Sequence, residues 1–174
     1  MSTGDYWEQR YQTGERLLSE GKLDEAHREL ATALADAESG GRGPAGIVTI
    51  LDALGRTEHQ AGRYRAAAGY FERSLKFAAK GSYAEAVVRS NAGQAYLALG
   101  NKVRAEASFR AAREILPQSA YLWHLMGQVL LQEKRFAEAE NALQNALHIW
   151  GESDPSHSAW ALNDLAILYQ AQKR

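Results

Sequence analysis

The 174-residue sequence contains no cysteine. This absence excludes disulfide bonds, thiolate nucleophiles, cysteine-based zinc sites and iron–sulfur ligation together. A chain without cysteine fits a reducing compartment, and we expect a cytoplasmic location. The first twenty residues are polar and hold no apolar run, so they do not have the pattern of a signal peptide.

Long hydrophobic runs and an excess of charge of one sign are also missing. No stretch approaches the roughly 18 consecutive apolar residues that a membrane span needs, so we expect no membrane partner. Twenty Lys and Arg residues face 21 Asp and Glu residues, which gives a net charge of −1. Such a balance offers no electrostatic reason to expect nucleic acid as a partner. With 45% hydrophobic residues, the chain can bury the core of one domain, 1–174.

Proline is scarce and occurs only where apolar-periodic segments begin or end, at Pro44, Pro117 and Pro155. Elsewhere alanine, leucine, glutamate, glutamine and arginine dominate, and these residues favour helices. No segment shows the alternation of β-branched and polar residues that is typical of a strand. The sequence therefore predicts an all-α fold.

One phrase recurs four times along the chain. Its copies begin at Gly21, Gly62, Gly100 and Lys134, and each ends in an alanine: Ala26, Ala67, Ala105 and Ala139. A large apolar and a small residue follow that alanine by four and seven positions, as Leu30/Ala33, Phe71/Ser74, Phe109/Ala112 and Leu143/Ala146. This spacing places them on one face of a helix.

A second phrase precedes each copy and contains a small residue beside large ones. The small residues are Gly14, Gly55, Gly93 and Gly127. A fifth copy, with Leu162, Leu165, Ala166 and Tyr169, has no second phrase after it. We expect the glycines to let the two helices of one hairpin approach closely, and the alanines to do the same between neighbouring hairpins.

The two phrases resemble the tetratricopeptide repeat, a helix–turn–helix unit of about 34 residues with a Trp-x-x-Leu-Gly-x-x-Tyr phrase and an Ala-x-x-x-Phe phrase. The resemblance covers nearly the whole chain and implies a right-handed α-α superhelix, a solenoid of about four hairpins plus one C-terminal helix. We expect hairpins at residues 5–39, 46–80, 82–117 and 119–150, and a terminal helix at 156–172. Extra residues between hairpins, at 39–46 and 151–158, together with the last phrase, are similar to the kinesin-light-chain style of repeat.

The terminal helix has no second helix after it within the sequence. Trp160, Ile167 and Leu168 add apolar surface to it, and we expect part of this surface to be exposed. Either the natural protein continues past Arg174, or this helix meets another copy or a partner.

No pattern in the sequence indicates an active site, a cofactor or a metal. The glycine-rich stretch 40–46 lacks the Lys-Ser/Thr ending of a phosphate loop and follows a helix, so we interpret it as an inter-hairpin loop. The five histidines lack metal-ligand spacing, and we expect His27 and His148 to be solvated. Arg104, Arg110 and Arg113 alternate with glutamates, which predicts a salt-bridged outer face instead of a nucleic-acid patch.

The resemblance implies that the first helix of each hairpin lines a concave groove where peptides bind. The residues expected on that side are Tyr11, Glu15, Asp52, Arg56, His59, Ser90, Asn91, Gln94, Tyr121, His124 and Gln128. Offsets of three and four place each group on one helix face. We predict that Asn91, His124 and Gln128 contact a bound peptide, with the two amides bonding to its backbone.

Co-chaperones of the family grip the C-terminal carboxylate of heat-shock chaperones with a lysine- and asparagine-rich clamp. Here Asn91 occupies the middle asparagine position, but Asp52, Arg56, Tyr121 and Leu125 stand where the other clamp residues are expected. Because Asp52 would repel a carboxylate, we expect no binding of a heat-shock chaperone tail.

Three functions remain open from the sequence. The first is a non-enzymatic scaffold that binds a peptide or a partner protein through the groove. The second is a regulatory or sensor module of a larger multidomain protein. The third is a structural homo-oligomer formed through the chain ends, with self-association through the C-terminal helix.

Overall fold

The computed structural model describes residues 6–41, 43–151 and 154–172. These residues form nine helices and no strand. The helices are α1 (Tyr6–Ser19), α2 (Leu23–Ser39), α3 (Pro44–Gln60), α4 (Tyr64–Leu75), α5 (Tyr83–Ala98), α6 (Lys102–Ile115), α7 (Ala120–Gln132), α8 (Phe136–Trp150) and α9 (Pro155–Ala171). The prediction of an all-α solenoid is confirmed.

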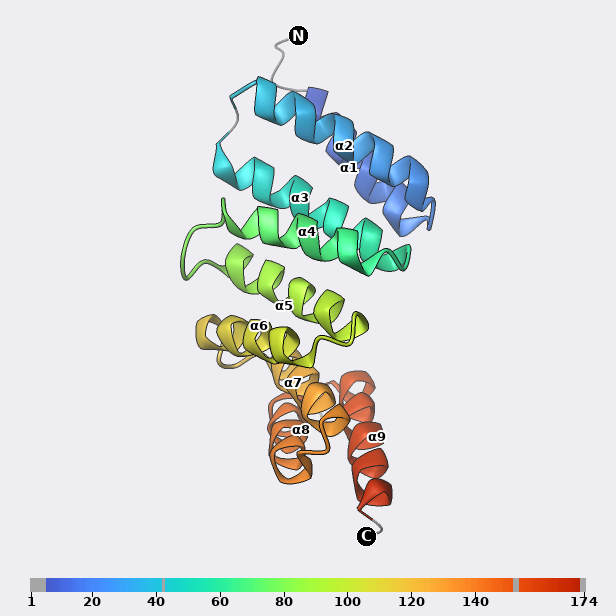
Figure 1. Cartoon of the computed structure of the whole chain (residues 1–174), viewed down its shortest axis with the longest axis vertical. Helices are drawn as coiled ribbons and strands as arrows, with labels where there is room; N and C mark the ends of the chain where they lie inside the picture. Colours follow the sequence, from blue (N-terminus) through green and yellow to red (C-terminus); the bar gives the residue numbers. More distant parts are fainter. Residues whose placement is uncertain (1–5, 42, 152–153, 173–174) are drawn as a thin grey trace.

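The helices pair in chain order and the pairs stack on one another, so the two ends of the chain lie at opposite ends of the molecule (Figure 1). Within the described ranges, helices contact only those one or two places away in the sequence. The odd-numbered helices α1, α3, α5, α7 and α9 contact each other in succession, whereas the even-numbered helices do not. The odd-numbered helices therefore form the more closely spaced inner layer, and the even-numbered helices form the outer layer.

The turn inside each hairpin explains why the repeated phrase begins with glycine. Gly21, Gly62 and Gly100 all adopt a left-handed backbone with φ of +74°. Lys134, which takes this place in the fourth hairpin, has φ of +60° and is the non-glycine residue with positive φ among those described. Glycine has no Cβ to clash in this conformation, so it is the natural residue for such a helix end.

Each hairpin closes around the glycine of its first helix. An added Cβ would meet Leu30 at Gly14, Phe71 at Gly55, Phe109 at Gly93 and Leu143 at Gly127. The expected close approach within hairpins is therefore confirmed. The phrase alanines are fully buried, and the carbonyl oxygen of Ala139 would lie 3.6 Å from a Cβ on Gly127. Ala139 thus takes part in the contact within its own hairpin.

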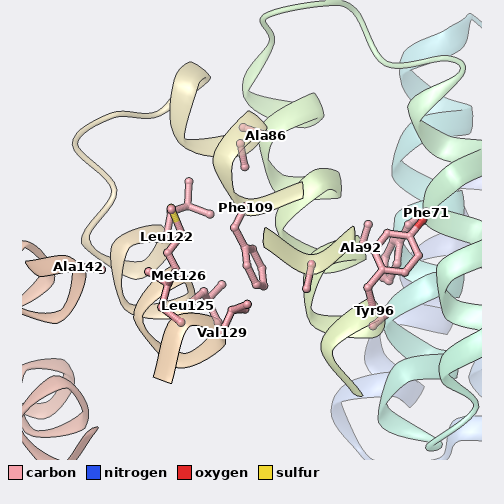
Figure 2. Close-up of a cluster of buried hydrophobic side chains, with 14 of the residues drawn as sticks. Phe71, Ala86, Ala92, Tyr96, Phe109, Leu122, Leu125, Met126, Val129 and Ala142 are labelled. Carbon is pink, nitrogen blue, oxygen red and sulfur yellow. The ribbon is translucent and has the colours of Figure 1, made fainter. Parts of the chain in front are cut away.

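The large residues of the second helices fill the layer between hairpins. Figure 2 shows the Phe109 ring between Ala92 on one side and Leu125 and Val129 on the other. Phe109 and Val129 are fully buried. Because a single hairpin cannot cover this side chain on both sides, the stacking of α5/α6 on α7 supplies the apolar burial that stabilises both.

Two helix boundaries differ from the expected ones. Residues 44–46 are helical and not part of a loop, because Pro44 has the fixed φ that suits the first position of α3 after Gly43. Arg42 lies outside the described residues. Helix α4 ends at Leu75 instead of continuing towards residue 80, and Ser82 begins α5 by accepting a hydrogen bond from Glu85 N at 3.1 Å.

The C-terminal helix begins at the expected Asp154-Pro155 pair, where the Asp154 side chain accepts a hydrogen bond from His157 N at 3.2 Å. The expected exposure of Trp160 and Ile167 is confirmed, with 48% and 46% of their surfaces accessible. The third of these residues, Leu168, does not add to the exposed surface. Leu168 is fully buried because it joins the main apolar cluster beside α8.

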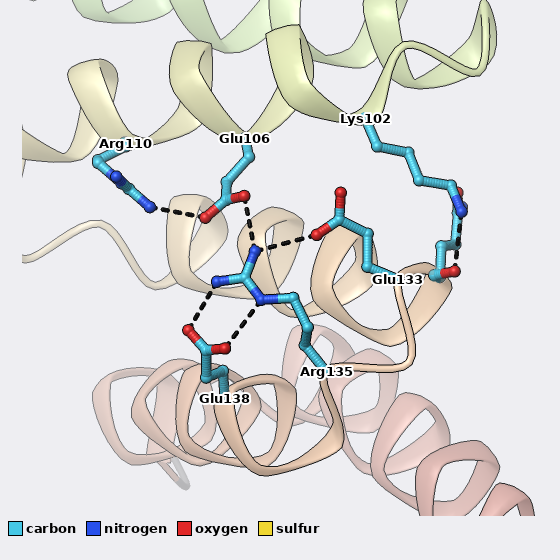
Figure 3. A network of polar contacts seen from close by, with 7 residues as sticks. Lys102, Glu106, Arg110, Glu133, Arg135 and Glu138 are labelled. Atoms are coloured by element: carbon cyan, nitrogen blue, oxygen red, sulfur yellow. Dashed lines mark hydrogen bonds and ion pairs between the residues drawn. The ribbon is translucent and has the colours of Figure 1, made fainter.

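The outer helices carry the predicted salt-bridged face. Figure 3 shows the guanidinium of Arg135 between three carboxylates, with contacts of 2.8 Å to Glu106, 3.0 Å to Glu133 and 2.7 Å to Glu138. Arg110 reaches the same Glu106 at 2.7 Å. This network connects α6 to the turn of the next hairpin and to the start of its second helix, α8.

His27 is not the solvated residue that its position on a second helix suggested. Its Nδ1 lies 2.8 Å from the buried carboxylate of Glu58, which also accepts a hydrogen bond from Arg63 Nε at 2.6 Å. The hydrogen bond from Arg63 is the main reason why the pKa of Glu58 lies below its ordinary value, since burial acts in the opposite direction. This cluster stabilises the contact between the first two hairpins. The other histidine expected to be solvated, His148 on α8, is exposed.

Candidate functional site

The inner layer contains two neighbouring hollows. The first hollow has a volume of about 460 Å³ and is lined by Glu15, Leu18, Ser19, Arg56, His59, Gln60, Phe71, Asn91 and Gln94. The second hollow has a volume of about 380 Å³ and is lined by Gln94, Tyr121, His124, Leu125, Gln128, Trp160, Asn163 and Asp164. Because Gln94 lines both, the hollows form one continuous surface over α1, α3, α5, α7 and α9.

A chain of charged and amide groups organises the first hollow. Arg56 on α3 donates from Nη2 to Glu15 Oε1 on α1 at 2.6 Å, and from Nε to Asp52 Oδ2 at 3.0 Å. Asn91 on α5 donates from Nδ2 to Asp52 Oδ1 at 2.9 Å. Burial disfavours the charge on Arg56, but Glu15 and Asp52 outweigh burial and raise its pKa. Glu15 and Asp52 therefore share a single guanidinium within the protein itself.

Ring groups lie at the edges of this network. Burial lowers the pKa of His59, whose ring packs edge-on against Tyr64 with centroids 5.1 Å apart. A neutral imidazole at physiological pH can donate and accept hydrogen bonds. Burial also raises the pKa of Tyr11, with Glu15 adding to the effect.

Asp164 is the central charged group of the second hollow. Its Oδ2 accepts hydrogen bonds from His124 Nε2 at 2.9 Å and from Gln128 Nε2 at 3.1 Å. Burial would raise the pKa of Asp164, but these hydrogen bonds outweigh burial and lower it. The carboxylate therefore keeps its negative charge although only 13% of the side chain is exposed.

Aromatic rings border this carboxylate. The exposed Trp160 packs edge-on against His157 with centroids 4.4 Å apart, and His157 in turn stacks on Trp150 at 5.5 Å. Tyr121, also exposed, donates from its hydroxyl to Gln94 Oε1 at 3.4 Å. Both exposed rings are thus held by neighbours while part of their surface stays accessible.

The structure brings most of the residues expected on the groove side together. Eight of them line the two hollows: Glu15, Arg56, His59, Asn91, Gln94, Tyr121, His124 and Gln128. Asp52 lies behind the first hollow and orients Arg56 and Asn91. Tyr11 packs beside an apolar cluster. Ser90 is 7% exposed and lines neither hollow, because its position on α5 turns into the helix packing.

The sequence reasoning missed the contribution of α9, namely Trp160, Asn163 and Asp164. The signal was nevertheless present. Asp164 lies two residues before Ala166, as Asn91 lies two residues before Gly93. Extending the inner-face positions to the fifth copy of the phrase would have placed Asp164 beside the others.

Within the described ranges, no cluster of three or more His, Asp or Glu residues has the arrangement of a metal site. The same ranges hold no helix whose length and apolar character would let it cross a membrane.

The arrangement is an open polar and aromatic surface on an α-helical repeat solenoid. Comparison with known families identifies the class: two family models, both described as tetratricopeptide repeat, match residues 47–81 and 118–174. The chain belongs to the tetratricopeptide repeat family.

Solved structures of the same architecture include BtubC (BKLC) from P. vanneervenii. It superposes with a TM-score of 0.85 at 23% identity, covering 98% of this chain and 74% of that one. A putative kinesin light chain from Podosopora anserina gives a TM-score of 0.84 at 16% identity, covering 99% of this chain and 89% of that one. At these identities the likeness establishes the fold alone.

A third similar structure is the first TPR of Spaghetti (RPAP3) bound to the HSP90 peptide SRMEEVD. Its TM-score is 0.63 at 19% identity, covering 73% of this chain and 94% of that one. No curated protein sequence matches the chain. Tetratricopeptide repeats generally mediate protein–protein interactions, and their fold is typically a non-enzymatic scaffold.

Proposed function

We propose that this protein is a non-catalytic scaffold that holds an extended peptide or a helix of a partner protein along its inner face. The observation that carries the proposal is the continuity of the two hollows through Gln94, which provides one surface from α1 to α9. Solenoids usually bind their partners on such an inner surface, where successive repeats each contribute contacts.

The side chains of this surface suit the recognition of a peptide. Asn91, Gln94 and Gln128 offer amides that donate and accept hydrogen bonds, as the backbone of an extended peptide requires. Tyr121 and Trp160 offer rigid aromatic area, which often supplies much of the binding free energy at interfaces. Shallow, open hollows of this kind favour binding over the water-excluded environment that catalysis needs.

The proposal excludes the C-terminal carboxylate tail of a heat-shock chaperone as the partner. Asn91 donates its amide to Asp52 at 2.9 Å, and no lysine lines the first hollow. A tail carboxylate placed there would meet Glu15 and Asp52 before any uncompensated cation. We propose no nucleic-acid partner, because the 20 Lys and Arg residues are balanced by 21 Asp and Glu residues. The cysteine-free composition is the ground for proposing a cytoplasmic location.

A selection of random dodecapeptides on the full chain tests this function. We expect selected peptides to lose at least about five-fold in affinity on Gln94→Ala, which corresponds to about 1 kcal/mol. Asn91→Ala and Gln128→Ala should act in the same direction, with circular dichroism showing that the fold is kept. Arg110→Ala on the outer helix α6 is the matched control and should leave the affinity unchanged. Sensitivity to Arg110→Ala alone would contradict binding at the inner face.

Self-association through α9 is a second candidate function. Leu162 and Ile167 on this helix are 53% and 46% exposed, and Ala166 beside them is exposed as well. In the other hairpins this small-residue position is covered by a leucine or phenylalanine of the second helix. We expect the solution mass to rise with concentration and Leu162→Glu to abolish the rise. A constant monomer mass for the unchanged chain would refute this candidate.

A further inference from the structure

The second hollow has a negative charge that no lysine or arginine among the described residues balances. Its lining residues include Asp164 but no Lys or Arg. Among the described ion pairs, Asp164 pairs with His124, and an imidazole is charged only when it is protonated. The first hollow differs in containing a cation, since the guanidinium of Arg56 contacts both Glu15 and Asp52.

The repeat register shows how this difference arises. Arg56 follows Gly55 directly in α3, and the residues that follow the corresponding glycines in α5 and α7 are Gln94 and Gln128. A glutamine amide can donate to a carboxylate, as Gln128 does to Asp164 at 3.1 Å, but it adds no positive charge. The position that supplies a cation to the first hollow is therefore neutral at the second.

The aromatic border of the second hollow suits a cation as well. A guanidinium or ammonium group within about 6 Å of an aromatic ring face is attracted by the ring quadrupole. Two arginines of α6 make this contact among the described residues: the guanidinium of Arg104 lies 4.5 Å from the Tyr96 ring centroid, and that of Arg113 lies 4.2 Å from the Trp123 centroid. In the second hollow, Tyr121 and Trp160 present accessible rings without such an arginine.

We propose that the second hollow binds a basic side chain, arginine or lysine, of the partner peptide, with Asp164 as counter-ion and Trp160 and Tyr121 as ring contacts. This inference rests on the proposed function and specifies the chemistry of its ligand. The basic side chain would take at the second hollow the place that Arg56 takes at the first. His124 and Gln128 keep the carboxylate in position, so little reorganisation is needed when the cation arrives.

The dodecapeptide selection described above also tests this inference. We expect arginine or lysine to be enriched at one position of the selected peptides. A synthetic peptide of the set is then compared with a version in which citrulline, the neutral isostere of arginine, replaces that residue. Citrulline should weaken binding at least about ten-fold to the unchanged chain, and far less to the Asp164→Asn variant. The coupling between the two changes measures the proposed contact directly.

Two variants separate this contact from general effects. Glu15→Gln removes a carboxylate of the first hollow and should show no coupling with the citrulline change. Trp160→Leu keeps apolar bulk at an exposed position but removes the ring quadrupole, and should weaken the arginine peptide more than the citrulline peptide. If Asp164→Asn does not fold, Trp160→Leu still tests whether the second hollow binds the basic side chain.

The failure of this inference is distinguishable from the failure of the proposed function. Peptides that lose affinity on Gln94→Ala but contain no enriched basic residue, or that show no coupling with Asp164, would overturn the inference and leave inner-face binding intact. Selected peptides that are insensitive to Gln94→Ala, or a selection that yields none, would overturn both.

Discussion

Leu143 occupies the space that a side chain on Gly127 would need. A Cβ at Gly127 would lie 2.6 Å from Leu143 Cδ2 and 2.7 Å from its Cγ, well inside contact distance. Gly127→Leu should therefore force α7 and α8 apart and lower the free energy of unfolding by about 1–3 kcal/mol or more. Ala139→Leu should act alike, because Ala139 is fully buried at the same contact. Urea denaturation of both variants measures the effect.

Gly69 provides the control for this prediction. It lies within α4, but a Cβ there would meet nothing within 4 Å. Gly69→Ala should raise the stability by about 0.5–1 kcal/mol, since alanine is the better helix former. Equal stability of the Gly127 and Gly69 variants would mean that the helix contact is not tight.

Lys134→Gly should stabilise the protein. Lys134 has φ of +60°, in a turn where three other hairpins have glycine at +74°. A left-handed conformation costs a residue with a Cβ about 1–2 kcal/mol, part of which is offset by the greater freedom of glycine in the unfolded chain. We expect a net gain of about 0.5–1 kcal/mol in chemical denaturation. The reverse change, Gly100→Lys, should lose a similar amount, and a loss for both would contradict the explanation.

Acid should weaken the joint between the first two hairpins through Glu58. Because the pKa of Glu58 is lowered in the folded protein, chiefly by Arg63 and further by His27, its stabilising contribution is present above the ordinary value of 4.5. The contribution is lost as the pH falls below 4.5 through the folded pKa. Glu58→Gln should be less stable than the unchanged chain at pH 7 by about 1–3 kcal/mol.

The difference in stability between the unchanged chain and the Glu58→Gln variant is the quantity to follow, since other carboxylates titrate equally in both. Thermal denaturation from pH 7 to pH 3 should show the difference shrinking below pH 4.5. A difference that stays constant over this range would show that the Glu58 charge does not contribute.

Ser90→Ala should raise the stability by about 1 kcal/mol and leave peptide affinity unchanged. The Ser90 hydroxyl is buried and meets no hydrogen-bond partner among the described residues, and such a group destabilises a fold. Ser74 is the matched control, because its hydroxyl is also buried but donates to Val48 O at 3.1 Å. Ser74→Ala should lower the stability by about 1 kcal/mol. Calorimetry of the two variants measures whether each substitution raises or lowers the stability.

The fold was predictable because it depends on spacing that repeats. Gly93 and Phe109, for example, belong to phrases that recur in four hairpins, and the structure places each such pair in contact. The boundaries between hairpins were less predictable. They depend on single local events, such as the start of α3 at Pro44 directly after Gly43, which occur once and follow no repeat.

The candidate surface was predictable in its layer but not in its contacts. The resemblance to the repeat family, together with helical spacing, put Asn91 and His124 on the inner side, where they lie. It could not show that His124 is 5% exposed, or that Ser90 turns inward, because burial depends on how neighbouring helices cross. The hydrogen bonds from His124 and Gln128 to Asp164 join α7 to α9, 36 to 40 residues apart, and a pattern within one repeat carries no information on such pairs.

Helices in the described ranges touch only those one or two places away along the chain. In most domains, segments that are distant in sequence pack against one another, and these contacts resist bending. Here the resistance to bending comes only from the contacts between successive helices. Small rotations at each contact therefore add up from α1 to α9. A partner that spans the inner face, as proposed above, would bind best at one curvature. By reciprocity, pulling on the two ends of the protein should alter how tightly the partner is held, which makes the stack sensitive to mechanical tension.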